Sequence, residues 1–101
     1  MIATLFFAGN AIGACDSRQC TGTIKRLYMD ATNIYVQLDG DVKKLGCSLH
    51  GGKYIGAPLV HPAFGAWHAM LLGAFRDRSA VTVRKQDGAA GCLIAYVVMD
   101  R

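Results

Sequence analysis

A single helical segment interrupts a succession of short strand-like segments, and this order limits the folds that the chain can adopt. Residues 62–77 begin with a proline, which suits the first turn of a helix. The same segment places apolar side chains at helical spacing: Phe64, Trp67, Leu71, Ala74 and Phe75. Strand-like runs lie on both sides of it, at 21–29, 33–38, 42–50, 80–85 and 92–100. The sequence therefore predicts three strands, one helix and two further strands.

The strand-like segments differ in how many of their faces are apolar. In 33–38, Ile34 and Val36 share one face, and Tyr35 projects from the other. Residues 92–100 are apolar on both faces, which predicts a strand that is central or covered on both sides. We predict a mainly β fold with one α-helix between strands three and four. It is either a five-stranded OB-like barrel or a curved antiparallel sheet with the helix packed across it.

Length and composition fit one small folded domain. The 101 residues are too few for two domains, and 52% hydrophobic residues supply a core, which excludes a disordered chain. The net charge is +4, and the seven acidic residues are all aspartates. This small positive excess permits an anionic partner and does not require one. We predict a single OB-like domain at 15–101.

The first fourteen residues carry no charged side chain. Their apolar part is too short to span a bilayer, so we expect no integral membrane span. The segment resembles the apolar region of an export signal, with small residues before a cut after Ala14. Two alternatives remain: a lipoprotein signal that would acylate Cys15, which would leave an odd number of thiols, and an N-terminal strand at 2–7.

Four cysteines in a short chain are an even count that suits disulfides. Three pairings are open. We favour Cys15–Cys20, which are close in sequence, with Cys47–Cys92, which an OB-like barrel can place on neighbouring third and fifth strands. The signal-like opening and the cysteines predict a secreted or periplasmic protein; the alternative is a cytoplasmic protein with four reduced thiols.

No pattern in the sequence points to catalysis or to a metal. The chain has no glutamate, its aspartates lie mostly in turns, and none of its serines stands in a nucleophile-elbow sequence. The spacings of His50, His61 and His68 match no standard set of metal ligands. We therefore predict a protein that is not an enzyme and has no cofactor and no metal site.

One aromatic residue and several cations lie on strands that an OB-like barrel brings together. Tyr35 could stack on a base or a sugar ring, and basic doublets lie on or beside three strands. The alternative is that these cations bind nothing and are ordinary solvated side chains at strand edges, where lysine blocks pairing with another strand. The candidate ligand-binding residues are Tyr35, Lys25, Arg26, Arg84 and Lys85.

The layout resembles a known family. A strand cysteine is followed by the helical "AMLLGAF", then by "SAVTV", then by a final strand that opens on a cysteine. Over residues 21–100 this is similar to the small OB-fold B subunits of bacterial toxins of the pertussis and subtilase type, and to related small exported bacterial proteins of unknown role. The resemblance implies glycan binding and a strand-to-strand bridge between Cys47 and Cys92, and we expect a homo-oligomer. None of the family's sugar-binding residues has a match here.

These observations support three functions in order. The first is a small exported, non-catalytic binding module that binds a glycan and forms a homo-oligomer. The second is an OB-type binder of single-stranded nucleic acid in the cytosol, which ranks lower because a net charge of +4 is small for that task. The third is an interaction protein that dimerises through a sheet edge.

Overall fold

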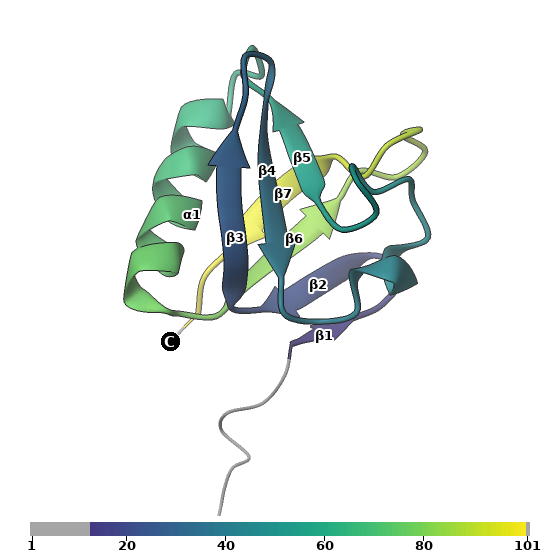
Figure 1. Cartoon of the computed structure of the whole chain (residues 1–101), viewed down its shortest axis with the longest axis horizontal. Helices are drawn as coiled ribbons and strands as arrows, with labels where there is room; N and C mark the ends of the chain where they lie inside the picture. The colour runs from purple at the N-terminus through teal and green to yellow at the C-terminus, as the bar shows by residue number, and fades with distance from the viewer. Residues whose placement is uncertain (1–12, 101) are drawn as a thin grey trace, which may run out of the picture.

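The computed structural model describes residues 13–100, which form two antiparallel sheets and one α-helix (Figure 1). One sheet has the order β1-β2-β6-β7, from Ala14–Cys15, Gln19–Gly22, Val81–Lys85 and Ile94–Val98. The other has the order β3-β4-β5, from Ile24–Met29, Asn33–Leu38 and Ile55–Pro58. The helix α1 spans Phe64–Asp77, and a short 3₁₀ helix, η2, spans Val42–Leu45. The expected export signal or strand at 1–14 lies outside the described residues except for its last two positions.

The mainly β class with one helix is confirmed, but the predicted strand count and helix position are wrong. Residues 13–100 contain seven strands instead of five, and α1 lies between the fifth and sixth strands instead of the third and fourth. Two local differences explain most of the change. The predicted strand at 21–29 divides into β2 and β3, which belong to different sheets, and the predicted strand at 42–50 does not form.

The division of the first strand occurs at Gly22 and Thr23, where the carboxylate of Asp39 holds the bend. Its Oδ1 accepts hydrogen bonds from the backbone N–H of Gly13 at 3.1 Å and of Thr23 at 3.2 Å, and its Oδ2 accepts from the Thr23 hydroxyl at 3.0 Å. A Cβ atom on Gly22 would lie 2.9 Å from the Cα of Gly13. The chain can therefore pass from one sheet to the other here because glycine permits a very close backbone approach.

The segment expected to be the third strand begins with a 3₁₀ turn. The side chain of Asp41 accepts a hydrogen bond from the backbone N–H of Lys43 at 3.3 Å, and Gly46 ends the turn with a φ of 72°. Val42 and Leu45 are buried on its inner side. The third position in the sheet is taken by β5, whose Ile55 and Ala57 are both fully buried.

The two sheets do not close into a barrel, so that part of the prediction is also wrong. At one corner the chain runs directly from β2 into β3. At the other corner β5 and β7 are joined only by an isolated parallel bridge between Gly56 and Leu93, with the Gly56 N–H donating to the Cys92 carbonyl at 2.9 Å. Pro58, two residues on, has no N–H to donate toward β7. Pairing therefore stops there, and β7 is an edge strand instead of a central one.

Both sheets and the helix contribute to one core. It includes Ile34 and Val36 from β4, Val83 from β6 and Ile94 from β7, each at most 1% exposed. Because the inner faces of the two sheets meet in this core, their outer faces point away from one another. That separation decides which of the predicted binding residues can act together.

The predicted helix is present, and its apolar stripe is confirmed with one exception. Trp67, Leu71 and Ala74 are buried in the core. Phe75 is 43% exposed, because it lies eleven residues after Phe64 and shares with it the outer edge of the stripe. His61 stacks on Trp67 at a ring distance of 4.5 Å, and its Nδ1 accepts from the Ala63 N–H at 3.0 Å. The described helix is too short to cross a membrane.

Candidate functional site

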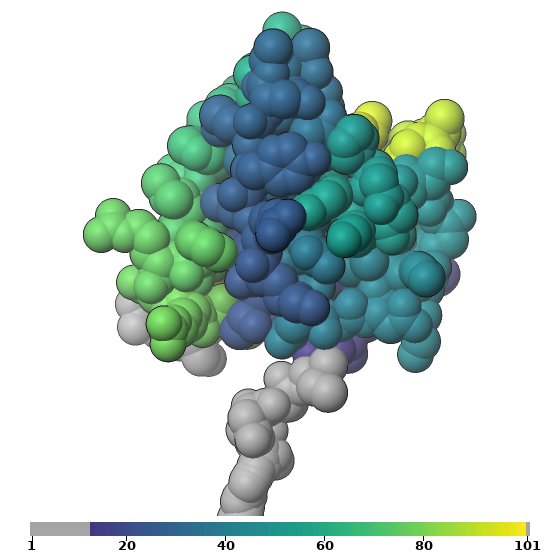
Figure 2. Space-filling view, viewed as in Figure 1, coloured from purple at the N-terminus to yellow at the C-terminus, as the bar shows by residue number. Residues whose placement is uncertain are grey.

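Four aromatic side chains form a continuous group on the outer face of the β3-β4-β5 sheet. We call Tyr28, Tyr35, His50 and Tyr54 the aromatic surface. Tyr35 stacks on His50 with ring centroids 4.1 Å apart, and Tyr28 lies 4.9 Å from Tyr35 and 5.1 Å from Tyr54. Figure 2 shows the face of the molecule to which these strands belong: β3 in blue lies beside the teal segments that follow η2.

Strand register and one glycine assemble this group. Tyr28 and Tyr35 are directly opposite on β3 and β4, and Gly56 of β5 is opposite Tyr35. A Cβ atom on Gly56 would lie 3.4 Å from the Tyr35 ring, so the ring rests over a position that has no side chain. His50 and Tyr54 pair across a tight turn, with N–H···O bonds of 3.1 and 3.0 Å.

The four rings divide into two buried and two accessible ones. Tyr35 and Tyr54 are each 7% exposed, whereas Tyr28 is 37% exposed and His50 is exposed. Burial raises the pKa of the Tyr35 hydroxyl, and the nearby charge of Asp30 raises it further. Tyr35, the predicted stacking residue, therefore supports the rings above it, and Tyr28 and His50 present the faces that a ligand could reach.

A hollow of about 230 Å³ adjoins the aromatic surface. Its walls include the side chains of Asn33, Ser48 and His50, together with Gly91 and Cys92. The Cys47–Cys92 disulfide, with Cα atoms 5.2 Å apart, ties together the two segments that form one wall. The Cys92 N–H also donates to the Ser48 carbonyl at 3.0 Å. The hollow thus combines polar side chains with a covalently fixed backbone.

Two of the predicted cations lie on the same sheet as the aromatic surface. Arg26 donates from Nη1 to the Tyr54 hydroxyl at 3.5 Å, so its guanidinium lies at the margin of the rings. Lys25 is exposed at a register shift between Ile24 and Arg26. Lys53, in the turn between His50 and Tyr54, is a further exposed cation that the sequence patterns did not single out.

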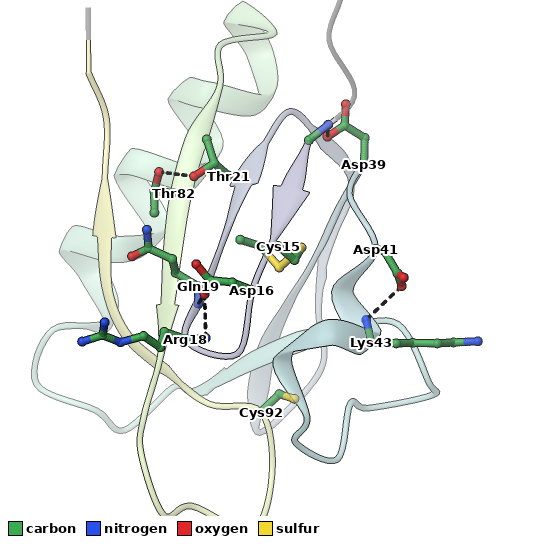
Figure 3. Close-up of a disulfide and its surroundings, with 12 residues drawn as sticks. Cys15, Asp16, Arg18, Gln19, Thr21, Asp39, Asp41, Lys43, Thr82 and Cys92 are labelled. Atoms are coloured by element: carbon green, nitrogen blue, oxygen red, sulfur yellow. Dashed lines mark hydrogen bonds between the residues drawn. A yellow bond between two sulfur atoms is a disulfide. The ribbon is translucent and has the colours of Figure 1, made fainter.

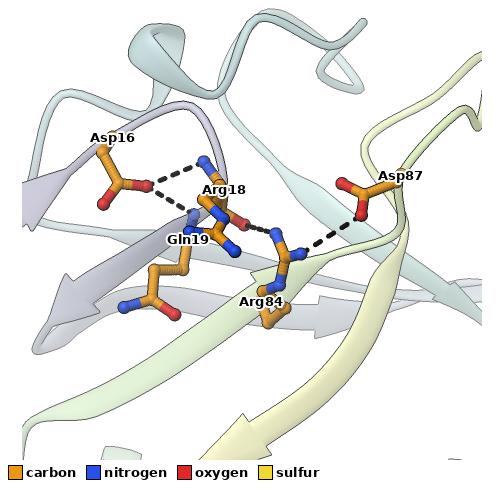
Figure 4. Close-up of polar contacts among 5 residues, drawn as sticks. All are labelled: Asp16, Arg18, Gln19, Arg84 and Asp87. Carbon is orange, nitrogen blue, oxygen red and sulfur yellow. Dashed lines mark hydrogen bonds and ion pairs between the residues drawn. The ribbon is translucent and has the colours of Figure 1, made fainter.

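The other two predicted cations lie on the other sheet. Arg84 donates from Nη1 to the Arg18 carbonyl at 3.1 Å and forms an ion pair with Asp87 at 3.2 Å (Figure 4). The backbone N–H of Lys85 also donates to the Arg18 carbonyl, at 3.0 Å. The structure therefore does not bring Arg84 and Lys85 to Tyr35, and the predicted five-residue site is split between two faces.

Both disulfides of the favoured pairing are present, and all four cysteines are bonded. Cys15 and Cys20 face one another on β1 and β2 with Cα atoms 4.0 Å apart (Figure 3). Cys47 and Cys92 lie in irregular segments beside one another, not in the third and fifth strands, so the structural reason given for their pairing is wrong. Two disulfides in so small a domain indicate an oxidising environment.

The chemistry that this arrangement can perform is binding by stacking and hydrogen bonding. Within residues 13–100, no three histidine, cysteine or aspartate side chains come together as metal ligands. The two accessible rings and the adjoining polar hollow can instead accept a flat or apolar ring that carries hydroxyl or amide groups at its edge.

Of the four aromatic residues, sequence analysis selected only Tyr35 as a binding residue. Tyr28 could have been found, since a turn centred on Ala31 and Thr32 places residue 28 opposite residue 35. Tyr54 was missed because Gly56 and Pro58 weaken the strand pattern of its segment. His50 was assigned to a strand that does not form, so its position beside Tyr35 had no signal in the sequence.

Comparison of the chain with models of protein families, with curated proteins and with solved structures found no match.

Proposed function

We propose that this protein is a small exported, non-catalytic binding domain that binds a glycan at the aromatic surface. The observation that carries the proposal is the pair of accessible rings, Tyr28 and His50, backed by two buried tyrosines beside a polar hollow. Support from buried neighbours fixes the rings before a ligand arrives, which lowers the entropy lost on binding.

The chemistry of a sugar ring matches this combination. One face of a pyranose presents C–H groups, which pack on an aromatic ring, and its rim presents hydroxyls, which need hydrogen-bond partners. Asn33 and Ser48 offer amide and hydroxyl groups in the adjoining hollow. Flexible charged side chains are not needed for such a ligand, so the modest net charge of +4 is no obstacle.

The order in which the strands pair supports an OB-type site. The continuous chain of β2 and β3 pairs with β6 and with β4, β4 pairs with β5, and β5 is bridged in parallel to the segment that leads into β7. This order of pairing is that of an OB-type fold, although the two sheets do not close, and OB folds bind oligosaccharides and oligonucleotides on the face of the second and third strands. Those strands would be β4 and β5, which carry Tyr35 and Gly56.

Export and oligomerisation belong to the same proposal. Two disulfides support a secreted or periplasmic location, because cytosolic thiols are kept reduced. The bonded cysteines also offer no thiolate nucleophile, which supports a non-catalytic role. A homo-oligomer remains an expectation from the layout that resembles the toxin B subunits, and light scattering at several protein concentrations tests it.

Single-stranded nucleic acid is the second candidate ligand. Lys25 and Arg26 are exposed on β3, Lys53 is exposed in the turn between His50 and Tyr54, and bases stack on aromatic side chains such as tyrosine. Nucleic-acid binding would fall steeply as salt rises, because bound counterions are released from the phosphates.

An array of glycans and single-stranded oligonucleotides, probed at low and at physiological salt, tests the proposal. We expect glycan signals that change little with salt. Oligonucleotide signals that vanish at higher salt would replace the first candidate by the second. A blank array together with a dimer whose contact buries Tyr28 would favour an interaction protein over both.

A further inference from the structure

A second hollow, on another part of the molecule, has a different character. It has a volume of about 470 Å³ and lies where β3 begins and α1 ends, lined by Thr23, Ile24, Phe75, Arg76 and Arg78. Figure 1 shows these two element ends side by side, and the contacts between α1 and β3 agree. The lining combines two guanidinium groups with an exposed phenyl ring, a set that the aromatic surface does not use.

Neither arginine of this hollow is paired with a carboxylate within residues 13–100. Both are exposed, and within residues 13–100 neither side chain makes a hydrogen bond or an ion pair. Asp77 stands between the two arginines in the sequence and lines a separate hollow with Ser79, Met99 and Asp100, and the Asp39 carboxylate is bonded to Thr23. The C-terminal end of a helix carries only about half a negative charge, which two guanidinium groups exceed. The hollow lined by Phe75, Arg76 and Arg78 therefore presents two guanidinium groups whose donors have no partner within the described part of the chain.

Arg78 adds an independent observation. It is the only residue other than glycine with a positive φ in the described part of the chain, at 57°. The position that follows the last turn of a helix is normally glycine when the backbone is left-handed there, because a side chain strains it. Non-glycine residues held in the left-handed region are uncommon and cluster at ligand-binding and other functional sites. An arginine at this strained position is therefore explained if its guanidinium binds a ligand.

We propose that this hollow binds a tetrahedral oxyanion, a phosphate or sulfate group, carried on a molecule with an apolar part. Guanidinium groups bind such oxyanions through paired N–H···O bonds. Phe75 and Ile24 would contact the apolar part, and Thr23 is held in place by its hydrogen bonds to Asp39. The carrier is either a soluble ester or the phosphate headgroup of a lipid, and the site is independent of the aromatic surface.

Titration of ¹⁵N-labelled protein with phenyl phosphate, inorganic phosphate and benzyl alcohol at constant ionic strength tests the site. We expect the amide signals of Thr23, Ile24, Arg76 and Arg78 to shift together. Phenyl phosphate should saturate them at a several-fold lower concentration than inorganic phosphate, and benzyl alcohol should have little effect. Shifts scattered over the whole surface would overturn the proposal.

A matched pair of double variants separates this site from general charge attraction. Arg76→Gln with Arg78→Gly and Lys43→Gln with Lys44→Gln each remove two positive charges, the second pair from exposed positions on η2. The first should weaken phenyl phosphate binding at least tenfold without lowering the melting temperature, because glycine relieves the strain at position 78. The second should weaken it less than twofold. Equal losses in both would contradict a local site.

Vesicles of phosphatidylcholine with and without phosphatidic acid distinguish the two carriers. Arginine-dependent binding to the phosphatidic acid vesicles identifies a lipid headgroup, and binding to phenyl phosphate alone identifies a soluble ester. If neither probe binds, the proposal is wrong. Tyr28→Ala should leave both probes unaffected, so failure of this site and failure of the glycan site are read separately.

Discussion

The outer faces of the two sheets carry different kinds of side chains. On β3-β4-β5, four aromatic rings lie against one another, and Arg26 at their margin has a single hydrogen bond of 3.5 Å. On β1-β2-β6-β7, hydroxyls and a cation already have partners. The Thr21 and Thr82 hydroxyls bond to one another at 2.7 Å, and Arg84 is bound to the Arg18 carbonyl and to Asp87.

This difference bears on which face a ligand would contact more readily. A polar group that is already bonded must give up its partner before it can bind another, so little free energy is gained. The exposed face of an aromatic ring has no such partner to lose. We therefore propose the β3-β4-β5 face as the binding face, whereas Arg84 on the other sheet is already bound to the Arg18 carbonyl and to Asp87.

The largest expected effect comes from removing the two disulfides. Cys15–Cys20 joins β1 to β2 in one sheet, and Cys47–Cys92 fixes the hollow beside the aromatic surface of the other. In the chain-entropy model, closing 45 residues by Cys47–Cys92 corresponds to about 4 kcal/mol, and closing 5 residues by Cys15–Cys20 to about 2 kcal/mol. We expect Cys47→Ala with Cys92→Ala to lower the free energy of unfolding by the larger amount. It should also disorder the hollow beside the aromatic surface.

Urea denaturation of both double variants measures these losses. Glycan binding should fall only in the variant that lacks Cys47–Cys92. A greater loss of stability in the Cys15→Ala, Cys20→Ala variant would contradict this ranking, and unchanged glycan binding without Cys47–Cys92 would show that the wall of the hollow does not depend on its disulfide.

A smaller effect is expected where β5 supports the Tyr35 ring. Gly56→Val would place methyl groups into the ring, whose atoms already lie 3.4 Å from an ideal Cβ. Overpacking of this kind costs about 1–3 kcal/mol and should displace the ring from under His50. Thr82→Val on the other sheet is the control, and we expect it to lose no more than about 1 kcal/mol. Thermal denaturation compares the two, and equal losses would mean that Tyr35 does not rest on Gly56.

The smallest effect concerns one aspartate in the hairpin of each sheet. Backbone N–H groups of Arg18 and Gln19 lower the pKa of Asp16, and those of Thr32 and Asn33 lower the pKa of Asp30. A lowered folded-state pKa adds stability above the ordinary aspartate pKa of about 3.9, and this stability is lost as the pH falls through the folded value. Asp16→Asn and Asp30→Asn should each destabilise the protein at neutral pH, and the effect should shrink as the pH falls below the ordinary aspartate pKa and through the lowered folded-state pKa.

Only Asp30 is connected to the aromatic surface, which allows the two aspartates to be told apart. Its charge raises the pKa of the Tyr35 hydroxyl, so Asp30→Asn should lower that pKa while burial still keeps it above the usual value. An alkaline absorbance titration of the tyrosines detects this change. Asp16→Asn should leave the titration as in the parent protein, and a change there of similar size would remove the proposed link between Asp30 and Tyr35.

The elements with strong local periodicity, one helix and one strand, were predicted at nearly their observed positions. The helix was expected at 62–77 and spans Phe64–Asp77, and the strand expected at 33–38 spans Asn33–Leu38, because both have strong periodicity. The segment 42–50 has the alternation of a strand, but Asp41 caps a 3₁₀ turn there. The strand β5 was not predicted because Gly56 and Pro58 are unfavourable in strands. In this fold the Tyr35 ring rests over Gly56, and Pro58 has no N–H with which to continue the pairing toward β7.

The aromatic surface could be predicted only in part. Alternation placed Tyr35 on the face opposite Ile34 and Val36, and both of these are in the core. The meeting of Tyr35 with His50 and Tyr54 depends on how β5 pairs with β4 and on a tight turn, which are contacts between residues distant in sequence. Charge patterns likewise could not reveal that Arg84 would bind a carbonyl and Asp87 instead of remaining free.

The most direct test compares one exposed tyrosine from each sheet. Tyr28 is 37% exposed on the aromatic surface, and Tyr96 is 48% exposed on β7, so their removal deletes similar rings from opposite faces. Fluorescence polarisation with the labelled glycan that gives the strongest array signal measures the affinity of Tyr28→Ala and Tyr96→Ala, with circular dichroism to check that both are folded. We predict binding at least tenfold weaker for Tyr28→Ala, equivalent to about 1.4 kcal/mol, and a change below twofold for Tyr96→Ala. Equal affinities in the two variants, or a greater loss in Tyr96→Ala, would contradict the assignment of binding to the β3-β4-β5 face.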